Sequence, residues 1–241
     1  MLKIKNISAG YGKKQVLFDV SFNVGLGEIV LLIGGNGAGK STVLKAIYGL
    51  LKPYNGSKVF FDGKDITGSH SSNLIQRGLV YIPQKDNCFE ELTVQENLEV
   101  AGLTLKDKKV LSERIDYVYQ VLSLLSEFRQ STPFKMSGGE RQLLALGMAL
   151  LHQPKLILFD EPTAGLSPKN TGKILEKISE LNNSKISFVI VEHKVKETIK
   201  LADKIIGLKY GKIFKNIDCN NKVKNKNTDL EYIKLLDDVF V

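Results

Sequence analysis

No apolar run in this sequence of 241 residues is long enough to cross a lipid bilayer. The longest candidates, residues 29–33 and 143–151, fall well short of the ~18 to 20 residues that a spanning helix needs. The first residues also lack the apolar stretch of a secretory signal. We therefore expect a chain that is not exported by that route, and a membrane role only through a separate partner chain.

Cysteine, histidine and arginine are scarce. The two cysteines, Cys88 and Cys219, make no disulfide framework, and no Cys/His cluster has zinc spacing, which favours free thiols in a reducing cytoplasm. Three histidines leave little material for a His-rich metal site. The net charge is +8, but most of the basic residues are lysines, which pair less well than arginine with phosphate. We interpret this charge as a solvated surface and expect no nucleic-acid partner.

The first third of the chain alternates between strand patterns and one helix. Apolar residues make up 43% of the chain, as in a globular protein with a real core. Residues 1–24 alternate around a Gly-rich break, which predicts antiparallel strands. The continuous apolar run at 28–33 is typical of a strand buried on both faces. Helical spacing follows over 40–51, then a hairpin around 57–61 and a strand at 78–83.

The middle of the chain changes character before the strands return. From about residue 92 to 150 the spacing of apolar residues is helical, and Thr93 and Glu96 have capping-box spacing. After Pro154, the apolar run at 155–160 predicts another buried strand. The remaining predicted elements are a helix from Ser167-Pro168, a strand at 186–191, a hairpin at 204–214 around Tyr210-Gly211, an Asn/Lys-rich linker at 216–227 and a short helix from Thr228.

The most specific motif begins at residue 34. Residues 34–41 read Gly-Gly-Asn-Gly-Ala-Gly-Lys-Ser and fit the phosphate-loop pattern between a predicted strand and a predicted helix. The glycines let successive N–H groups form a nest for phosphate oxygens, to which the helix N-terminus adds its positive end. Lys40 can then reach the β- and γ-phosphates, while Ser41 ligates Mg²⁺ and Thr42 donates near the α-phosphate. The predicted nucleotide-binding residues of this loop are Gly34, Asn36, Gly37, Ala38, Gly39, Lys40, Ser41 and Thr42.

Two carboxylates end the apolar run at 155–160. Asp160 can hold Mg²⁺ through a water molecule, and Glu161 can orient and deprotonate the water that attacks the phosphate. Phosphoryl transfer depends on such positioning and on charge neutralisation more than on covalent chemistry. Together with the phosphate loop, this pair predicts a site for phosphoryl transfer.

Residues 137–140, Ser-Gly-Gly-Glu, open a predicted helix. Ser137 and Glu140 have capping-box spacing, so a well-capped helix alone would account for them. The Ser137 hydroxyl and the N–H groups of Gly138 and Gly139, at a positive helix end, also make an anion site. One phosphate loop and a second phosphate-binding helix end in the same chain suggest an arrangement shared between two molecules.

The predicted fold is α/β, with a P-loop NTPase core in which helices flank a mixed sheet. An antiparallel β subdomain stands at the N-terminus, and a helical subdomain is inserted later. We predict a single nucleotide-binding domain over residues 1–241. Its predicted parts are a catalytic core at 1–84 and 152–215, a helical subdomain at 85–151, and a linker plus C-terminal helix at 216–241.

The order of the motifs resembles that of ATP-binding subunits of ABC transporters over roughly residues 1–215. The residues that carry this resemblance are Tyr11, the loop at 34–41, Gln84, the segment at 137–140, the run at 156–161 and His193. In that family the residue at Tyr11 stacks on adenine, and Val16 lies beside it. Gln84 matches the glutamine that contacts Mg²⁺ and the attacking water, and His193 matches the histidine that contacts the γ-phosphate.

The resemblance implies a cycle as well as a site. ATP and Mg²⁺ are the implied cofactors. The implied metal residues are Ser41, Gln84 and Asp160, and the implied catalytic residues are Lys40, Gln84, Glu161 and His193. Two subunits, identical or different, pair head to tail with each ATP between one phosphate loop and the other chain's Ser137, Gly138 and Gly139. Their closing and opening drive a multi-spanning permease, which holds them at the cytoplasmic face of the cell membrane. Importers add a substrate-binding protein.

Some positions depart from the family pattern, and others indicate a particular branch of the family. Met136 and Glu140 replace the outer residues of the usual Leu-Ser-Gly-Gly-Gln, and Ser167 stands where the loop after Glu161 usually has Asp. Residues 165–168 and 92–98 resemble importers of branched-chain amino acids, the branch we favour. Lipopolysaccharide-export ATPases share Arg77-Gly78 and the signature Glu, and are the alternative. Phe89 is expected to contact the permease.

Two other classes of protein remain as alternatives. A soluble ABC ATPase acting on nucleic acid or ribosomes usually carries two sets of motifs or a coiled-coil insertion, and this sequence has neither. A P-loop GTPase or kinase would leave residues 137–139 without a role, and the guanine-recognition motif Asn-Lys-x-Asp is missing.

Overall fold

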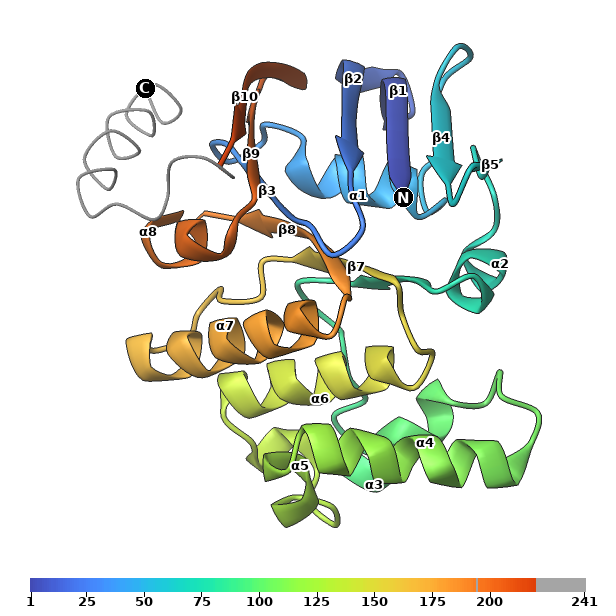
Figure 1. Cartoon of the computed structure of the whole chain (residues 1–241), viewed down its shortest axis with the longest axis vertical. Coiled ribbons are helices and arrows are strands. Elements are labelled where there is room, and N and C mark those ends of the chain that lie inside the picture. The colour runs from blue at the N-terminus through green and yellow to red at the C-terminus, as the bar shows by residue number, and fades with distance from the viewer. Residues whose placement is uncertain (194, 220–241) are drawn as a thin grey trace.

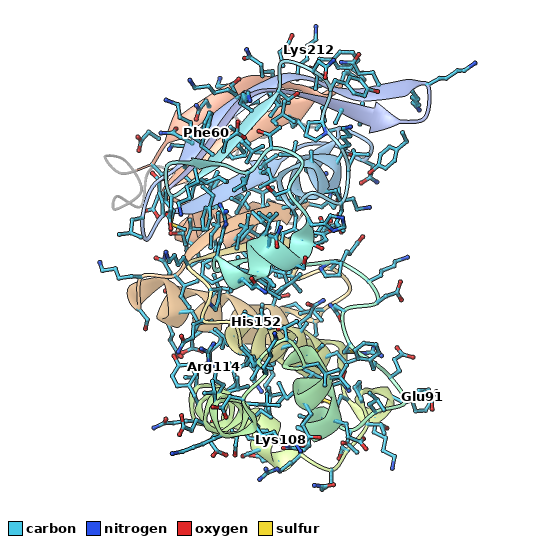
Figure 2. All side chains as sticks on the ribbon, turned by 90° about the vertical axis from the view of Figure 1, so that its right-hand side faces the viewer. Phe60, Glu91, Lys108, Arg114, His152 and Lys212 are labelled. Carbon is cyan, nitrogen blue, oxygen red and sulfur yellow. The ribbon has the colours of Figure 1, made fainter. Side chains whose placement is uncertain are left out.

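The computed structural model describes residues 1–193 and 195–219. A β layer lies at one end, a second sheet crosses the middle, and helices fill the other end (Figure 1). From the side, the labelled Phe60 and Lys212 mark the β end, and Lys108 and Arg114 mark the helical end (Figure 2). The helix predicted from Thr228 lies outside the described residues. No helix among the described residues combines the length and apolarity of a transmembrane span.

The β layer is a four-stranded antiparallel sheet in the order β2-β1-β4-β5. Its strands are β1 (Leu2–Tyr11), β2 (Lys14–Val24), β4 (Lys58–Phe61) and β5 (Lys64–Asp65). The alternation over residues 1–24 therefore predicted the β1–β2 pairing correctly. The Gly-rich break was predicted as a turn over residues 10–12, but Tyr11 is still part of β1 and is its last residue.

The central sheet has six strands in the order β10-β9-β3-β8-β7-β6 within the described residues. Its strands are β3 (Ile29–Ile33), β6 (Leu79–Ile82), β7 (Leu156–Asp160), β8 (Ser187–Glu192), β9 (Lys204–Lys209) and β10 (Lys212–Asp218). All neighbours are parallel except β10, which runs antiparallel to β9. The predicted mixed sheet is confirmed.

Helices cover both faces of the central sheet (Figure 1). The helices are α1 (Lys40–Ile47), α2 (Ser71–Gln76), α3 (Val94–Ala101), α4 (Lys108–Val121), α5 (Leu124–Glu127), η1 (Pro133–Lys135), α6 (Gly138–Leu150), α7 (Pro168–Asn183), α8 (Val195–Thr198) and η2 (Ile199–Leu201). The capping boxes predicted at Thr93 and Ser137 both form. Ser167 caps α7, as its place before Pro168 predicted.

The strand β3 shows why the central strands are apolar throughout. Leu31 packs into the core that the sheet shares with α3, α4, α6 and α7, whereas Val30 and Leu32 pack toward α1 and the antiparallel sheet. All five residues of β3 are buried. A strand covered on both faces has no solvent side, so its sequence cannot alternate.

Two predicted boundaries were wrong. The helix predicted over 40–51 ends at Ile47, because Gly49 adopts a left-handed φ of 73° and leaves Leu50 55% exposed. A Cβ at Gly49 would lie 2.0 Å from the Ser69 carbonyl oxygen, so only glycine allows this close approach. At the other end of the chain, β10 continues to Asp218, past residue 215, where we expected the core to end.

Candidate active site

Four segments far apart in the sequence meet at the carboxyl edge of the parallel strands. The phosphate loop follows β3, Gln84 follows β6, Asp160 and Glu161 stand at the end of β7, and His193 follows β8. This edge is where open α/β sheets bind their ligands. The parallel direction of the strands thus brings together residues that the sequence separates by more than a hundred positions.

The phosphate loop is held by its own backbone and by Lys40. Gly37 and Gly39 have left-handed φ values of 76° and 101°. The Lys40 ammonium group donates to the carbonyl oxygens of Gly34 at 2.9 Å and Gly35 at 3.1 Å. Lys40 is thereby fixed inside the loop with its charge beside the N-terminus of α1, where anions bind.

Lys40 is a buried cation surrounded by acceptors. Burial lowers the pKa of Lys40, while the nearby carboxylates of Glu161, Asp160 and Glu192 act in the opposite direction. Its ammonium nitrogen lies 3.4 Å from Nδ1 of His193. A bound triphosphate would add negative charge at this position and favour the protonated lysine.

Asp160 is held by two hydroxyl groups. Ser41 Oγ donates to its Oδ1 at 2.9 Å, and the Tyr81 hydroxyl donates to its Oδ2 at 3.2 Å. Burial raises the pKa of Asp160, and these two hydrogen bonds oppose the shift. Burial, followed by the Asp160 charge, raises the pKa of Tyr81. Our sequence prediction missed Tyr81, whose only signal is a polar tip within an otherwise apolar strand.

Each carboxylate oxygen of Glu161 contacts a different side chain. Gln84 Nε2 donates to its Oε2, and His193 Nε2 lies 2.6 Å from its Oε1. The backbone of Glu161 has a φ of 51°, an unfavourable value for a side chain of this size. Such strain is common at functional residues, where the surrounding structure holds it in place. Glu161 therefore contacts two other predicted catalytic residues, Gln84 and His193.

A second buried glutamate, Glu192, lies behind His193. Its Oε1 accepts hydrogen bonds from the Thr163 backbone N–H at 2.9 Å and from the Thr163 hydroxyl at 2.7 Å. Its Oε2 lies 3.2 Å from the backbone N–H of His193. Glu192 therefore ties the loop after Glu161 to the segment that carries His193. Glu192 was not among the predicted site residues, although a carboxylate ending an apolar strand was a usable signal.

Glu192→Gln should loosen this tie without changing the size of the side chain. If the amide oxygen of the glutamine keeps the bonds to Thr163, its N–H₂ group faces the backbone N–H of His193. Two donors then face each other, and the hydrogen bond to His193 is lost. We expect kcat for ATP hydrolysis to fall about tenfold, the effect of roughly one lost charge-assisted hydrogen bond, while KM stays within about twofold. Glu180→Gln, in an exposed pair with Lys177, is the control. An unchanged kcat would show that Glu192 does not position His193.

A cavity of about 610 Å³ lies over the phosphate loop at this edge. Most of the predicted nucleotide-binding residues line it, together with three of the four predicted catalytic residues, of which Lys40 belongs to both groups. They are Val16, Asn36, Gly37, Ala38, Gly39, Lys40, Ser41, Thr42, Glu161 and His193. Lys14, Gln15, Phe18 and Tyr210 also line it, and none of these was predicted. Tyr11, by contrast, is 49% exposed at the end of β1 and is not part of the lining.

Residues 137–139 do not line the cavity over the phosphate loop. Gly138 lines a separate cavity of about 420 Å³, together with Gln84 and Leu166. The Ser137 hydroxyl accepts from the Glu140 N–H, and the Glu140 carboxylate accepts from the Ser137 N–H at 2.7 Å. A Cβ on Gly138 would lie 3.0 Å from Leu166, so packing alone already favours glycine there. Within one chain, this helix end does not reach the phosphate loop.

An apolar cavity of about 410 Å³ lies between the central sheet and the helical part. Phe89, the residue predicted to contact a permease, lines it and is 51% exposed. The fully buried Asn97 holds this segment in place. Its amide group donates to the carbonyl oxygens of Phe89 at 2.9 Å and Leu92 at 3.0 Å, and its oxygen accepts the Phe89 N–H at 2.7 Å.

The model of one protein family, described as "ABC transporter", matches residues 17–164, which is more than half of the chain. The chain belongs to the ABC transporter family. The high-affinity branched-chain amino acid transport ATP-binding protein BraG of Pseudomonas aeruginosa is 39% identical over 213 residues, covering 88% of this chain and 91% of its own. The lipopolysaccharide export system ATP-binding protein LptB of Haemophilus influenzae is 35% identical over 88% of both chains.

Solved structures agree with this assignment. A nucleotide-free ATP-binding cassette of an ABC transporter superposes with a TM-score of 0.85 at 29% identity, covering 98% of each chain. A dimeric post-hydrolysis cassette bound to ADP and Pi has a TM-score of 0.79 at 27% identity, covering 92% of this chain and 100% of that one. The protein is therefore an ABC transporter ATPase subunit with the cassette fold, and the predicted fold class and enzyme class are confirmed.

Proposed function

We propose that this ABC ATPase hydrolyses ATP at the edge where the phosphate loop, Asp160, Glu161 and His193 meet. The observation that carries the proposal is the position of Glu161, which Gln84 and His193 hold at the wall of the phosphate-loop cavity. From there its carboxylate would accept a proton from a water molecule aligned with the γ-phosphate. Lys40 and His193 would bind the phosphate oxygens, and Gln84 would help to orient the water.

The oxygen donors beside the loop fit a magnesium ion. Mg²⁺ at nucleotide sites takes one or two protein carboxylates, and phosphates and water complete its octahedron. The Ser41 hydroxyl and the Asp160 carboxylate, 2.9 Å apart, supply such a set, and Gln84 is proposed as a further contact. When bound, the ion would neutralise charge on the β- and γ-phosphates. Adenine is proposed to lie against Tyr11 and Val16.

We further propose that the site is completed by a second ATP-binding subunit, identical or related. None of Ser137, Gly138 and Gly139 lines the cavity over the phosphate loop, and Gly138 lines a different cavity. A head-to-tail pair would place them over the partner's triphosphate, with the positive end of α6 facing the anion. The dimeric cassette bound to ADP and Pi supports such a pairing.

The proposed partner of this dimer is a multi-spanning permease at the inner face of the cell membrane. The apolar cavity that contains Phe89 fits an apolar helix of such a partner. The favoured cargo is a branched-chain amino acid, with a substrate-binding protein as a further component, because BraG carries that function in its name. Lipopolysaccharide export is the alternative, supported by the likeness to LptB.

Copurification of the native complex tests this proposal. A tagged chain should bring down a multi-spanning permease from native membranes, and a branched-chain amino acid with its binding protein should stimulate ATP hydrolysis in the reconstituted complex. Phe89→Asp should lose the permease while the free chain keeps its ATPase activity. Leu103→Asp, at another exposed apolar residue, is the matched control. Recovery of a lipopolysaccharide exporter would overturn the cargo assignment.

The net charge of +8 should not confer tight binding to nucleic acid. Lysine charges spread over a surface give only weak, salt-dependent attraction to phosphate backbones. We expect duplex DNA to bind with a Kd of about 1 µM or weaker at physiological salt. A tighter, salt-sensitive complex in a fluorescence anisotropy titration, or stimulation of ATP hydrolysis by DNA or ribosomes, would favour the soluble-ATPase alternative.

A further inference from the structure

Tyr210 is an aromatic residue in an unusually exposed position. It lies in the turn between β9 and β10, and 81% of its surface is exposed. It also lines the cavity over the phosphate loop, facing residues of β2 and the loop itself. The sequence predicted only that Tyr210 lies in a hairpin turn. An aromatic ring that stays exposed leaves apolar surface in water, so we asked what this ring contacts when the cavity is filled.

The backbone at Tyr210 makes the choice of tyrosine unexpected. Tyr210 and Gly211 form a two-residue hairpin turn with φ values of 50° and 74°. Such turns prefer Asn-Gly or Asp-Gly, because both positions are left-handed and bulky side chains disfavour that region. Asparagine would therefore satisfy the turn better than tyrosine does. A residue that the local structure disfavours, at a ligand cavity, points to a role for its side chain.

The turn is anchored to both walls of the cavity. The Gly211 N–H donates to the Ala38 carbonyl of the phosphate loop at 3.0 Å, and the Gly211 carbonyl accepts from the Phe18 N–H at 2.9 Å. A Cβ at Gly211 would lie 1.8 Å from the Val16 carbonyl oxygen, so the turn packs directly on β2. The position of Tyr210 relative to the loop is thus set by backbone bonds. Lys212, the first residue after this turn, lies at the β end of the molecule (Figure 2).

The lining of the cavity suggests what Tyr210 meets. The phosphate loop supplies backbone N–H groups and Lys40, which suit the triphosphate. The large apolar side chains of the lining are Val16, Phe18 and Tyr210. Lys212 Nζ lies 5.7 Å from the centre of the Phe18 ring, so a cation already covers a face of that ring. Tyr210 is therefore an exposed aromatic surface in this lining, and such a surface suits the part of a nucleotide that is not phosphate.

We propose that Tyr210 contacts the nucleoside part of ATP and is a determinant of nucleotide affinity in this ABC subunit. The inference rests on the proposed placement of the triphosphate on residues 34–41. With adenine proposed to lie against Tyr11 and Val16, the Tyr210 ring packs on the ribose or on the other face of the base. Stacking on a base tolerates any base, because every base has an aromatic face. Tyr210 does not touch the reacting atoms, so it acts on binding and not on the chemical step.

The test compares Tyr210→Asn with Tyr210→Phe in the full chain. Asparagine keeps the turn, so the variant should fold with an unchanged or higher Tm. We expect it to raise the Kd for ATP about tenfold while kcat stays within twofold, and phenylalanine to restore the affinity. Competition by inorganic tripolyphosphate, which has no nucleoside, should be unaffected. Tyr117→Asn, at an exposed tyrosine of α4, is the matched control.

Each outcome decides a separate point. An unchanged Kd for ATP in Tyr210→Asn overturns the inference. An equal loss of affinity for ATP and tripolyphosphate also overturns it, because the effect would then come from a distorted phosphate loop. If the wild-type chain binds ATP no better than Lys40→Ala does, the proposed triphosphate site itself fails, which is a different result.

Discussion

Glu161→Gln should lower kcat for ATP hydrolysis by about a thousandfold while leaving ATP binding nearly unchanged. Glutamine has the same shape as glutamate and can still accept the hydrogen bond from Gln84. It cannot take a proton from water, however, and general-base catalysis of this kind contributes about 10² to 10⁴ in rate. Phosphate release under saturating ATP, together with a direct measurement of the Kd, separates the loss of chemistry from any loss of binding.

The same variant should also trap the dimer. If ATP lies between two subunits and its hydrolysis releases them, Glu161→Gln should accumulate as an ATP-bound dimer in light scattering, while the wild type returns to monomer as ATP is consumed. Glu113→Gln, at an exposed glutamate of α4, controls for the loss of a charge. Turnover at the wild-type rate in Glu161→Gln would remove Glu161 from the catalytic role.

Lys40→Ala should lose at least a hundredfold in ATP affinity. The buried ammonium group bonds the carbonyl oxygens of Gly34 and Gly35 and stands at the N-terminus of α1, where the triphosphate is proposed to bind. Removing one partner of a buried charge pair costs about 3 to 5 kcal/mol, which corresponds to a factor of more than 100. Isothermal titration with ATP in the presence of Mg²⁺ measures the change.

A matched control separates a specific loss of ATP binding from the general effect of removing a lysine. Lys58→Ala removes a lysine that forms only an exposed ion pair with Asp65, so it should bind ATP like the wild type. Thermal unfolding of Lys40→Ala shows whether the loop still folds, because the variant also loses two internal hydrogen bonds. ATP binding at wild-type strength in folded Lys40→Ala would exclude the proposed role of the lysine.

Patterns that act over a few residues predicted their part of the molecule well. The phosphate loop, the capping boxes at Thr93 and Ser137 and the strand ending at Asp160 are all read from neighbouring positions, and all form in the structure. Their physical causes are local: φ angles open to glycine, side chains that satisfy helix-end N–H groups, and apolar runs covered on both faces. The helix predicted to Leu51 was wrong because Gly49 packs against Ser69, a contact between separate segments.

Residues that act through distant contacts were missed. Tyr81 matters because β6 pairs with β7 and brings its hydroxyl group to Asp160. Glu192 matters because its carboxylate reaches Thr163, 29 positions away in the sequence. Tyr210 faces the phosphate loop only because the turn that carries it bonds to Ala38 and Phe18. None of these neighbours lies close in sequence, so no spacing rule could reveal them.

By itself, the sequence determined which chemical groups are available: a nest for phosphate, a lysine, two carboxylates at a strand end and a capped Ser-Gly-Gly helix start. Only the tertiary structure decided which of them share a site. Parallel pairing of β6, β7, β8 and β3 brings Gln84, Glu161 and His193 together, while the start of α6 is left at another cavity. Side-chain chemistry is a local property, whereas proximity depends on the order and direction of strands that are joined by long connections.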